Sequence, residues 1–218
     1  MDKFIVNYIL LCFICYFVGS IPTAYLIVKR KHNKDITKEG SGNVGSLNSY
    51  EISGSRATGI IVLVLDFLKG LIPALLLTYI MKLPLSIVFL PLIFLVVGHN
   101  FSIWLKFKGG RGLATSAGIG VIINFWILVI WCVLYLFAYL IKKNVHIGNI
   151  FATVFMPIVI LIFSSFIAGY NYDSIILNYA SNFNDSELLF AFSSSLSLVI
   201  LIKHINPFLE IVRNLKKN

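Results

Sequence analysis

The chain has 218 residues, of which 58% are hydrophobic and only 12% are charged, and its formal net charge is +9. Soluble domains carry about 25% charged residues and at most about 50% apolar ones, so the composition excludes a water-soluble fold. It predicts a single integral membrane domain over residues 1–218, with no room for a second globular domain. Lysine and arginine collect on the cytoplasmic side of membrane proteins, which explains the positive charge without nucleic acid binding.

The apolar runs predict an all-α bundle of transmembrane helices. Only an intact helix satisfies its own backbone in lipid, and about 20 residues cross the hydrocarbon core. Five runs are candidate spans: 4–28, 58–80, 84–98, 147–169 and 187–203. The first run follows a single basic residue and does not end in a small-x-small cleavage site. We therefore expect it to remain in the mature protein.

A sixth run, 113–141, has two interpretations. As one helix it would be roughly 43 Å long, whereas the hydrocarbon core is about 30 Å thick. It is therefore either one long tilted span or a short helical hairpin that turns near Asn124. With the N-terminus outside, the hairpin brings fifteen of the eighteen Lys and Arg residues to the cytoplasm. Charge thus favours about seven spans and a cytoplasmic C-terminus, with the acidic loop 170–186 outside.

The first of three polar segments reads Gly-Ser-Gly-Asn-Val-Gly-Ser-Leu-Asn over residues 40–48. It matches G-x-G-x-x-G by letter, but no strand precedes it, and Ser46 stands where a Walker A loop has lysine. Its backbone donors and short polar side chains are suited to cradling an anion. The alternative is an ordinary flexible connection.

The second polar segment combines Gly98-His99-Asn100 with residues 105–115, and it is the most informative part of the chain. Its glycines allow the backbone to approach a ligand closely, and they lead into a helix start, which favours bound phosphate. Arg111 could hold phosphate oxygens in bidentate fashion. A positive-inside loop touching lipid headgroups would explain the cations. It would not explain the glycines around Arg111, so we favour a ligand site.

The third polar segment, Lys203-His204-Ile205-Asn206, ends the last span. Histidine is suited to proton transfer near neutral pH, although a histidine at a helix end is more often a headgroup-facing residue.

Within the membrane, Asp66 and Lys69 share one helical face. They predict a paired structural ion bridge rather than a proton relay. The sequence Gly19-Ser20-Ile21-Pro22 is expected to bend or end the first span. The cysteines, Cys12, Cys15 and Cys132, are expected to be buried free thiols.

Taken together, these segments resemble the bacterial acyl-phosphate:glycerol-3-phosphate acyltransferase family. The matching stretches are 19–22, 40–45, 66–70, 98–102 and 105–110. The resemblance implies a seven-helix bundle in the bacterial plasma membrane with a cytoplasmic active site. It also implies acyl transfer from acyl phosphate to the 1-hydroxyl of glycerol 3-phosphate, the first step of phospholipid synthesis. No metal or nucleotide is expected, and the substrate's own phosphate is able to accept the hydroxyl proton.

By this resemblance, the candidate catalytic residues are Ser41, Arg111 and His204. The candidate substrate-binding residues are Asn43, Gly45, Asn48, His99, Lys106, Lys108, Gly109, Gly110, Gly112 and Asn206. The expected partners are acyl phosphate, glycerol 3-phosphate and membrane lipids.

Four positions depart from the family pattern. The family usually has threonine at Leu47, arginine at Glu51, lysine at Arg111 and asparagine at Pro207. Arginine in place of lysine keeps the charge but is not equivalent at a tight site. The alternatives are therefore a divergent member with another acceptor or little activity, and a non-catalytic phosphate- or lipid-binding protein or transporter. The hairpin has no matching repeat, which argues against transport.

Overall fold

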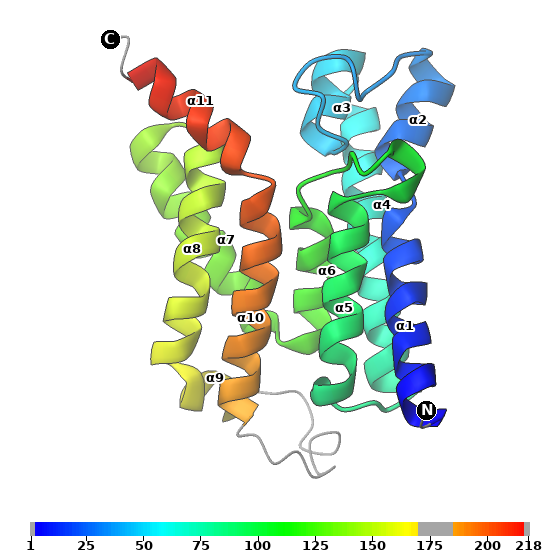
Figure 1. The fold of residues 1–218 in the computed structure, drawn as a ribbon. Helices are drawn as coiled ribbons and strands as arrows, with labels where there is room; N and C mark the ends of the chain where they lie inside the picture. Colours follow the sequence, from blue (N-terminus) through cyan, green and yellow to red (C-terminus); the bar gives the residue numbers. More distant parts are fainter. Residues whose placement is uncertain (1–2, 170–184, 216–218) are drawn as a thin grey trace.

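A computed structural model of the chain describes residues 3–169 and 185–215 as helices joined by loops, as predicted for an all-α protein. The helices, in chain order, are α1 (Lys3–Ser20), α2 (Thr23–His32), α3 (Ser46–Ser53), α4 (Arg56–Leu75), α5 (Leu85–Asn100), α6 (Leu113–Ile123), α7 (Phe125–Lys142), α8 (Val145–Ile162), α9 (Ser164–Gly169), α10 (Asp185–Ile202) and α11 (Ile205–Leu215) (Figure 1). A π-helical turn, Leu76–Ile80, extends α4, and a 3-10 turn covers Ile103–Leu105.

The outer surface of the bundle is apolar. Four helical segments are long and apolar enough to cross a membrane, namely Lys3–His32, Arg56–Ile80, Phe125–Lys142 and Val145–Ile162. Shorter apolar helices cover 85–100, 113–123 and 186–202. Large apolar side chains such as Phe13 and Phe137 are exposed. This arrangement is stable only where lipid surrounds the protein.

The buried core is centred on α5. Leu92 and Leu95 of this helix are fully buried, together with Ile119 of α6 and Phe192 of α10. Helices α1 and α5 also touch directly, since a Cβ at Gly19 would lie 1.9 Å from the carbonyl oxygen of Leu95. The ends of both helices are therefore held in fixed positions near the polar segments.

The run 113–141 is a helical hairpin, and the alternative of one long span is wrong. Helix α6 ends at Ile123, Asn124 is extended, and α7 runs back in the opposite direction (Figure 1). The Asn124 side chain caps α7 by accepting a hydrogen bond from the Trp126 N–H at 3.0 Å. With 11 residues, α6 is only about 16 Å long, roughly half the thickness of the hydrocarbon core.

The predicted break in the first span is also present. Helix α1 ends at Ser20 and α2 begins at Thr23, so Ile21 and Pro22 lie between the two helices. Proline lacks an N–H and cannot continue the backbone ladder.

Two helices were not predicted. Helix α3 begins inside the segment treated as a glycine-rich loop, and α11 follows His204. Pro207 lies in the first turn of α11, where its missing N–H leaves no hydrogen bond unmade.

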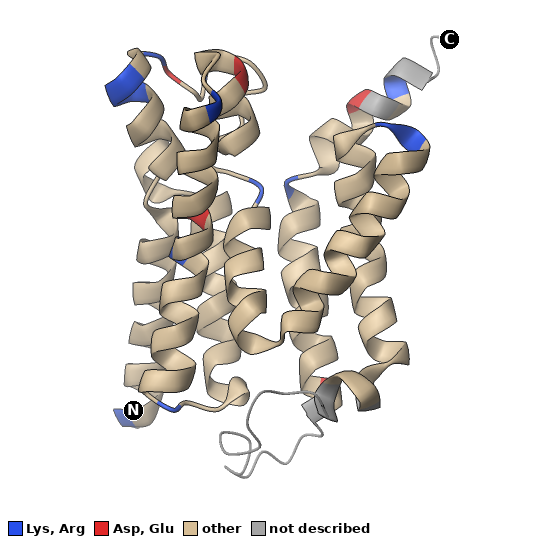
Figure 2. Cartoon of the chain, turned by 180° about the vertical axis from the view of Figure 1, so that it is seen from behind, with Lys and Arg blue, Asp and Glu red and all other residues tan. Residues whose placement is uncertain are grey.

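The basic side chains gather at one end of the molecule, where α2, α7 and α11 end, whereas the N-terminus lies at the other end (Figure 2). The three polar segments also lie at this basic end. Residues 170–184 of the predicted outer loop lie outside the described residues. The expectation of three buried thiols is wrong for Cys132, which is exposed on α7. A thiol is apolar enough to face lipid.

Candidate active site

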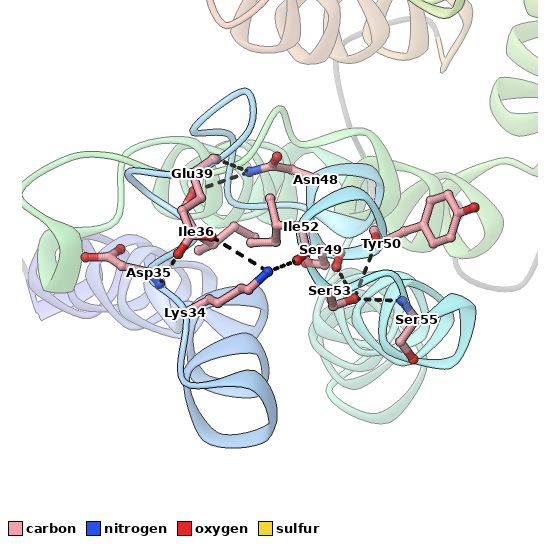
Figure 3. Close-up of polar contacts among 10 residues, drawn as sticks. All are labelled: Lys34, Asp35, Ile36, Glu39, Asn48, Ser49, Tyr50, Ile52, Ser53 and Ser55. Carbon is pink, nitrogen blue, oxygen red and sulfur yellow. Dashed lines mark hydrogen bonds and ion pairs between the residues drawn. The ribbon is translucent and has the colours of Figure 1, made fainter.

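The glycine-rich loop is ordered by Asn48 at the start of α3 (Figure 3). Its buried side-chain amide donates hydrogen bonds to the carbonyls of Ile36 (3.2 Å), Glu39 (3.2 Å) and Asn43 (3.0 Å). Its Oδ1 accepts from the Ser41 N–H at 3.1 Å. The loop is therefore held in shape around one side chain, which rules out an ordinary flexible connection.

A second brace connects the same segment to the end of α3 (Figure 3). The Lys34 ammonium donates a hydrogen bond to the Ile52 carbonyl and lies 4.0 Å from the Glu39 carboxylate. Within this frame, Ser41 is exposed and Asn43 is half-buried. Both side chains are therefore accessible to a ligand, whereas the Asn48 side chain is enclosed.

The second loop, Gly109–Gly112, packs closely on the end of α5. The Gly110 N–H donates to the His99 carbonyl at 3.1 Å, and a Cβ at Gly110 would lie 2.0 Å from His99 Nε2. Gly112 has φ +80°, in the left-handed region that favours glycine. These glycines are thus required by close packing and backbone conformation. His99 is buried beneath the loop.

One backbone contact joins the two loops. The Val44 N–H donates to the Gly109 carbonyl at 3.3 Å, although the two residues are far apart in the sequence. The first and second polar segments therefore form one surface at the basic end of the bundle.

The predicted ion pair is present beneath this surface. Lys69 Nζ lies 3.1 Å from Asp66 Oδ1, and both side chains are buried. Lys69 also donates to the Ile21 carbonyl at 2.9 Å, and the Thr23 hydroxyl donates to Asp66. His99 Nδ1 lies 3.7 Å from the same carboxylate oxygen. The pair therefore ties the α1–α2 break to α4 and α5, as expected for a buried pair with further polar partners.

Arg111 reaches across to α8. Its Nη1 lies 3.1 Å from Nδ1 of His146, a residue that is not among the candidates predicted from the sequence. Burial lowers the pKa of Arg111, and the Glu51 carboxylate acts in the opposite direction. The signal in the sequence that could have drawn attention to His146 is Asn144, an N-cap residue two positions earlier. Its side chain caps α8 by accepting hydrogen bonds from the N–H groups of His146 (2.9 Å) and Ile147 (3.1 Å).

His204 is buried just beyond α10, with 1% of its surface exposed. Its Nδ1 lies 2.9 Å from the Ile200 carbonyl, so Nδ1 carries the proton and Nε2 is left as an acceptor. Nε2 is buried and has no hydrogen-bond partner among the described residues. Burial lowers the pKa of His204 to about 4, and the Arg111 and His146 charges act in the same direction. His204 is therefore neutral near pH 7.

The end of α10 is fastened to the second polar segment. Asn100 donates a hydrogen bond to the Val199 carbonyl at 2.9 Å, and the Lys203 ammonium lies 4.4 Å from the centre of the Phe101 ring. These contacts fix His204 relative to the Gly109–Gly112 loop.

The remaining candidates are placed differently. Lys106, Lys108 and Asn206 are exposed, and Gly45 caps the N-terminus of α3. Within residues 3–169 and 185–215, no three His, Cys, Asp or Glu side chains gather closely enough to hold a metal ion.

Comparison with known proteins identifies the family. The family model for glycerol-3-phosphate acyltransferase matches residues 9–214. The chain belongs to the glycerol-3-phosphate acyltransferase family. Glycerol-3-phosphate acyltransferase 2 of Moorella thermoacetica is 36% identical over 154 residues, 69% of this chain and 76% of that protein. The glycerol-3-phosphate acyltransferase of Endomicrobium trichonymphae is 35% identical over 172 residues, 79% and 83% of the two chains.

The fold is similar to two crystal structures of PlsY (YgiH), an integral membrane glycerol 3-phosphate acyltransferase. The glycerol 3-phosphate form has a TM-score of 0.76 and 25% identity, over 95% of this chain and 93% of that chain. The lysophosphatidic acid form has a TM-score of 0.74 and 24% identity over the same shares. The family resemblance and the multi-pass membrane fold predicted from sequence are therefore confirmed.

Proposed function

We propose that this chain transfers an acyl group from an acyl phosphate to the 1-hydroxyl of sn-glycerol 3-phosphate, giving lysophosphatidic acid and phosphate. One observation carries the proposal. Two glycine-rich loops meet at Val44 and Gly109, and the second loop places Arg111 in one electrostatic cluster with His146 and a neutral His204. The relatives are glycerol-3-phosphate acyltransferases, and the similar crystal structures contain glycerol 3-phosphate or lysophosphatidic acid.

Both substrates carry phosphate, so the site needs two anion-binding elements. The backbone N–H groups of the glycine-rich loop, with Ser41 and Asn43, form one of them. The Gly109–Gly112 loop and Arg111 form the other, immediately before the N-terminus of α6, where the helix dipole favours negative charge. The acyl chain lies along the apolar helices.

The reaction then needs positioning more than covalent chemistry. The 1-hydroxyl oxygen attacks the acyl carbonyl carbon, the bond from that carbon to the phosphate oxygen breaks, and phosphate leaves with the electron pair. The hydroxyl proton passes to a phosphate oxygen. Before the transfer, His204 Nε2 accepts the hydrogen bond of the hydroxyl and so orients the acceptor; the hydroxyl then turns its single proton to the phosphate oxygen, while Arg111 stabilises the negative charge. An acyl phosphate is already activated, so no acyl-enzyme intermediate is required.

We assign supporting roles to two of the residues that were expected from sequence to bind substrate. The Asn48 amide is committed to the glycine-rich loop, and His99 lies under the Gly109–Gly112 loop. Lys106 and Lys108 are exposed at the basic end, where they meet phosphate headgroups or incoming substrate. Asn206 remains a proposed binding residue on the first turn of α11.

We place the site on the cytoplasmic side of the bacterial plasma membrane, with the N-terminus outside and seven helices within the lipid. The clustering of basic side chains at the end that holds the site supports this orientation (Figure 2).

Glu51 favours a second candidate function. Its carboxylate acts electrostatically on Arg111 and His146, at a position where the family resemblance implies arginine. A negative charge beside a phosphate site suits a divergent enzyme whose acceptor carries less negative charge than glycerol 3-phosphate. A non-catalytic transporter with the same anion site is the remaining alternative.

The test uses purified protein in detergent, given palmitoyl phosphate and glycerol 3-phosphate. We expect phosphate and lysophosphatidic acid in equal amounts, with much lower rates for Ser41→Ala and His204→Ala. Folded protein without turnover would end the proposal for this acceptor, and Glu51→Arg would then test whether the carboxylate excludes it. Uptake of glycerol 3-phosphate into proteoliposomes without acylation would instead support transport.

A further inference from the structure

Within residues 3–169 and 185–215, the Arg111 side chain has one hydrogen bond, and its partner is a second ionisable residue, His146, at 3.1 Å between Nη1 and Nδ1. Arginine has hydrogen-bond donors but no acceptor. His146 must therefore accept the bond through an unprotonated Nδ1, which assigns its proton to Nε2. The contact exists only while His146 is neutral, because a doubly protonated imidazole has no lone pair and repels the guanidinium.

The backbone of His146 is held firmly enough to serve as an anchor. Asn144 caps α8 and receives the His146 N–H at 2.9 Å. The side chain is half-buried, and the next turn of α8 begins with buried Gly148 and Asn149. A long arginine side chain loses rotamer freedom when it binds phosphate. A fixed neighbour that already holds it in place removes much of that cost.

Charged groups from several elements surround this contact. Glu51 of α3 and Glu210 of α11 act electrostatically on His146, and so does Arg111 from the second loop. His204, after α10, interacts with both Arg111 and His146. The contact therefore lies among charged groups of both signs, the carboxylates of Glu51 and Glu210 and the guanidinium of Arg111.

We propose that His146 is a positioning residue that holds the Arg111 guanidinium at the phosphate site through its neutral Nδ1. The inference rests on the proposed function, because that function makes Arg111 a phosphate contact. It follows that acid weakens substrate binding by protonating His146 and releasing Arg111.

Two replacements separate the position of the acceptor atom from the bulk of the side chain. In His146→Asn, the amide oxygen takes the place of Nδ1. In His146→Gln, it takes the place of Nε2, which faces away from the contact with Arg111. We expect His146→Ala to raise KM for one phosphate substrate about tenfold, as for loss of one hydrogen bond to a charged group. His146→Asn should restore most of the affinity, and His146→Gln should restore little.

The pH dependence supplies a readout that a purely structural role would not change. The phosphate substrates themselves titrate near pH 6, so kcat/KM of each variant is divided by the wild-type value at the same pH. The ratio for His146→Asn should rise as the pH falls from about 8 to about 5, because asparagine cannot be protonated. Control His32→Ala, at a histidine that contacts Thr58 instead, should give a flat ratio.

Three outcomes would overturn the proposal in folded protein: unchanged KM in His146→Ala, equal loss in His146→Asn and His146→Ala, or a flat pH ratio for His146→Asn. If the wild-type protein shows no turnover, the proposed function fails separately. Calorimetric binding of glycerol 3-phosphate by the same variants then applies the same three criteria to Kd.

Discussion

Arg111 and His204 lie in one electrostatic cluster, but Arg111 must be positively charged and His204 must be neutral. Arg111 is half-buried beside Glu51 and His146, and it supplies a fixed positive charge. His204 is buried in neutral form, with Nδ1 bonded to the Ile200 carbonyl and Nε2 without a hydrogen-bond partner in the described part of the chain. A cation for the phosphate and an uncharged acceptor for the hydroxyl are the two groups that the proposed transfer needs.

The variant Arg111→Ala tests whether the Arg111 guanidinium contributes to catalysis. We expect kcat/KM to fall by about a hundredfold or more, because one strong contact to the transition state is lost. Arg111→Lys keeps the charge but not the bidentate geometry, so its kcat/KM should lie between those of the wild type and Arg111→Ala. Steady-state kinetics on protein with an unchanged thermal midpoint measures both effects. Wild-type kinetics in Arg111→Ala would remove this residue from the site.

The pH profile tests His204. Its pKa is lowered from 6.5 to about 4 by burial, so it stays neutral as the pH falls through its ordinary value. The ratio of wild-type kcat/KM to that of His204→Ala should therefore be constant from about pH 8 to about pH 5, and it should fall only as the pH approaches 4. A fall centred near 6.5 would mean that the histidine is not held in neutral form.

Among the elements, α3 differs from the transmembrane helices in that it organises a loop rather than a core. Asn48 lies in its first turn and joins three backbone carbonyls and one N–H of the preceding segment. Gly40 and Gly42, with φ +58° and +67°, allow the backbone to wrap around this amide.

Asn48→Asp should loosen the loop. The carboxylate can still accept a bond from Ser41, but it cannot donate to any carbonyl. Unsatisfied buried groups typically cost about 1–3 kcal/mol each, so we expect a lower thermal midpoint and faster proteolysis within residues 40–45. The neighbouring Leu47 is exposed on the same helix, and Leu47→Ala is the matched control. Equal stability and proteolysis in the two variants would show that Asn48 does not hold the loop.

On the scale of the whole molecule, the bundle is apolar and the polar segments of the proposed site lie at one end of it. The basic end carries α3, the second loop and the start of α11, whereas Lys82 lies between the π-helical turn Leu76–Ile80 and α5, at the end that holds the N-terminus (Figures 1 and 2). The two ends therefore have different electrostatic character, which is the asymmetry that the positive-inside rule describes for helical membrane proteins.

Single cysteines at Lys38 and Lys82 test the proposed orientation. Both lysines are exposed and lie at opposite ends of the bundle. A membrane-impermeant maleimide should label Lys82→Cys in intact cells and Lys38→Cys only after the cells are opened. A Cys132→Ser background removes the exposed native thiol. The reverse labelling pattern would invert the topology.

Several features followed from the sequence because they depend on neighbouring residues. The Asp66–Lys69 pair follows from spacing on one helix, and the break at Pro22 from a missing N–H. The turn at Asn124 follows from a run too long for the membrane. The second loop was recognised from its glycines and cations. Helix α11 was missed because it is short and lies outside the apolar runs, although Ile205, Phe208 and Leu209 already share one face.

By itself, the sequence determined the membrane class, the helical runs, the clustering of positive charge and the family. These properties depend on composition, local spacing and motif order. Only the tertiary structure decided which polar groups meet, namely Val44 with Gly109 and Arg111 with His146. It also left His204 Nε2 buried without a hydrogen-bond partner among the described residues. It also showed that Asn48 is enclosed by the loop it holds. Such contacts join residues that are distant in the chain, so they depend on how the helices pack rather than on any local pattern.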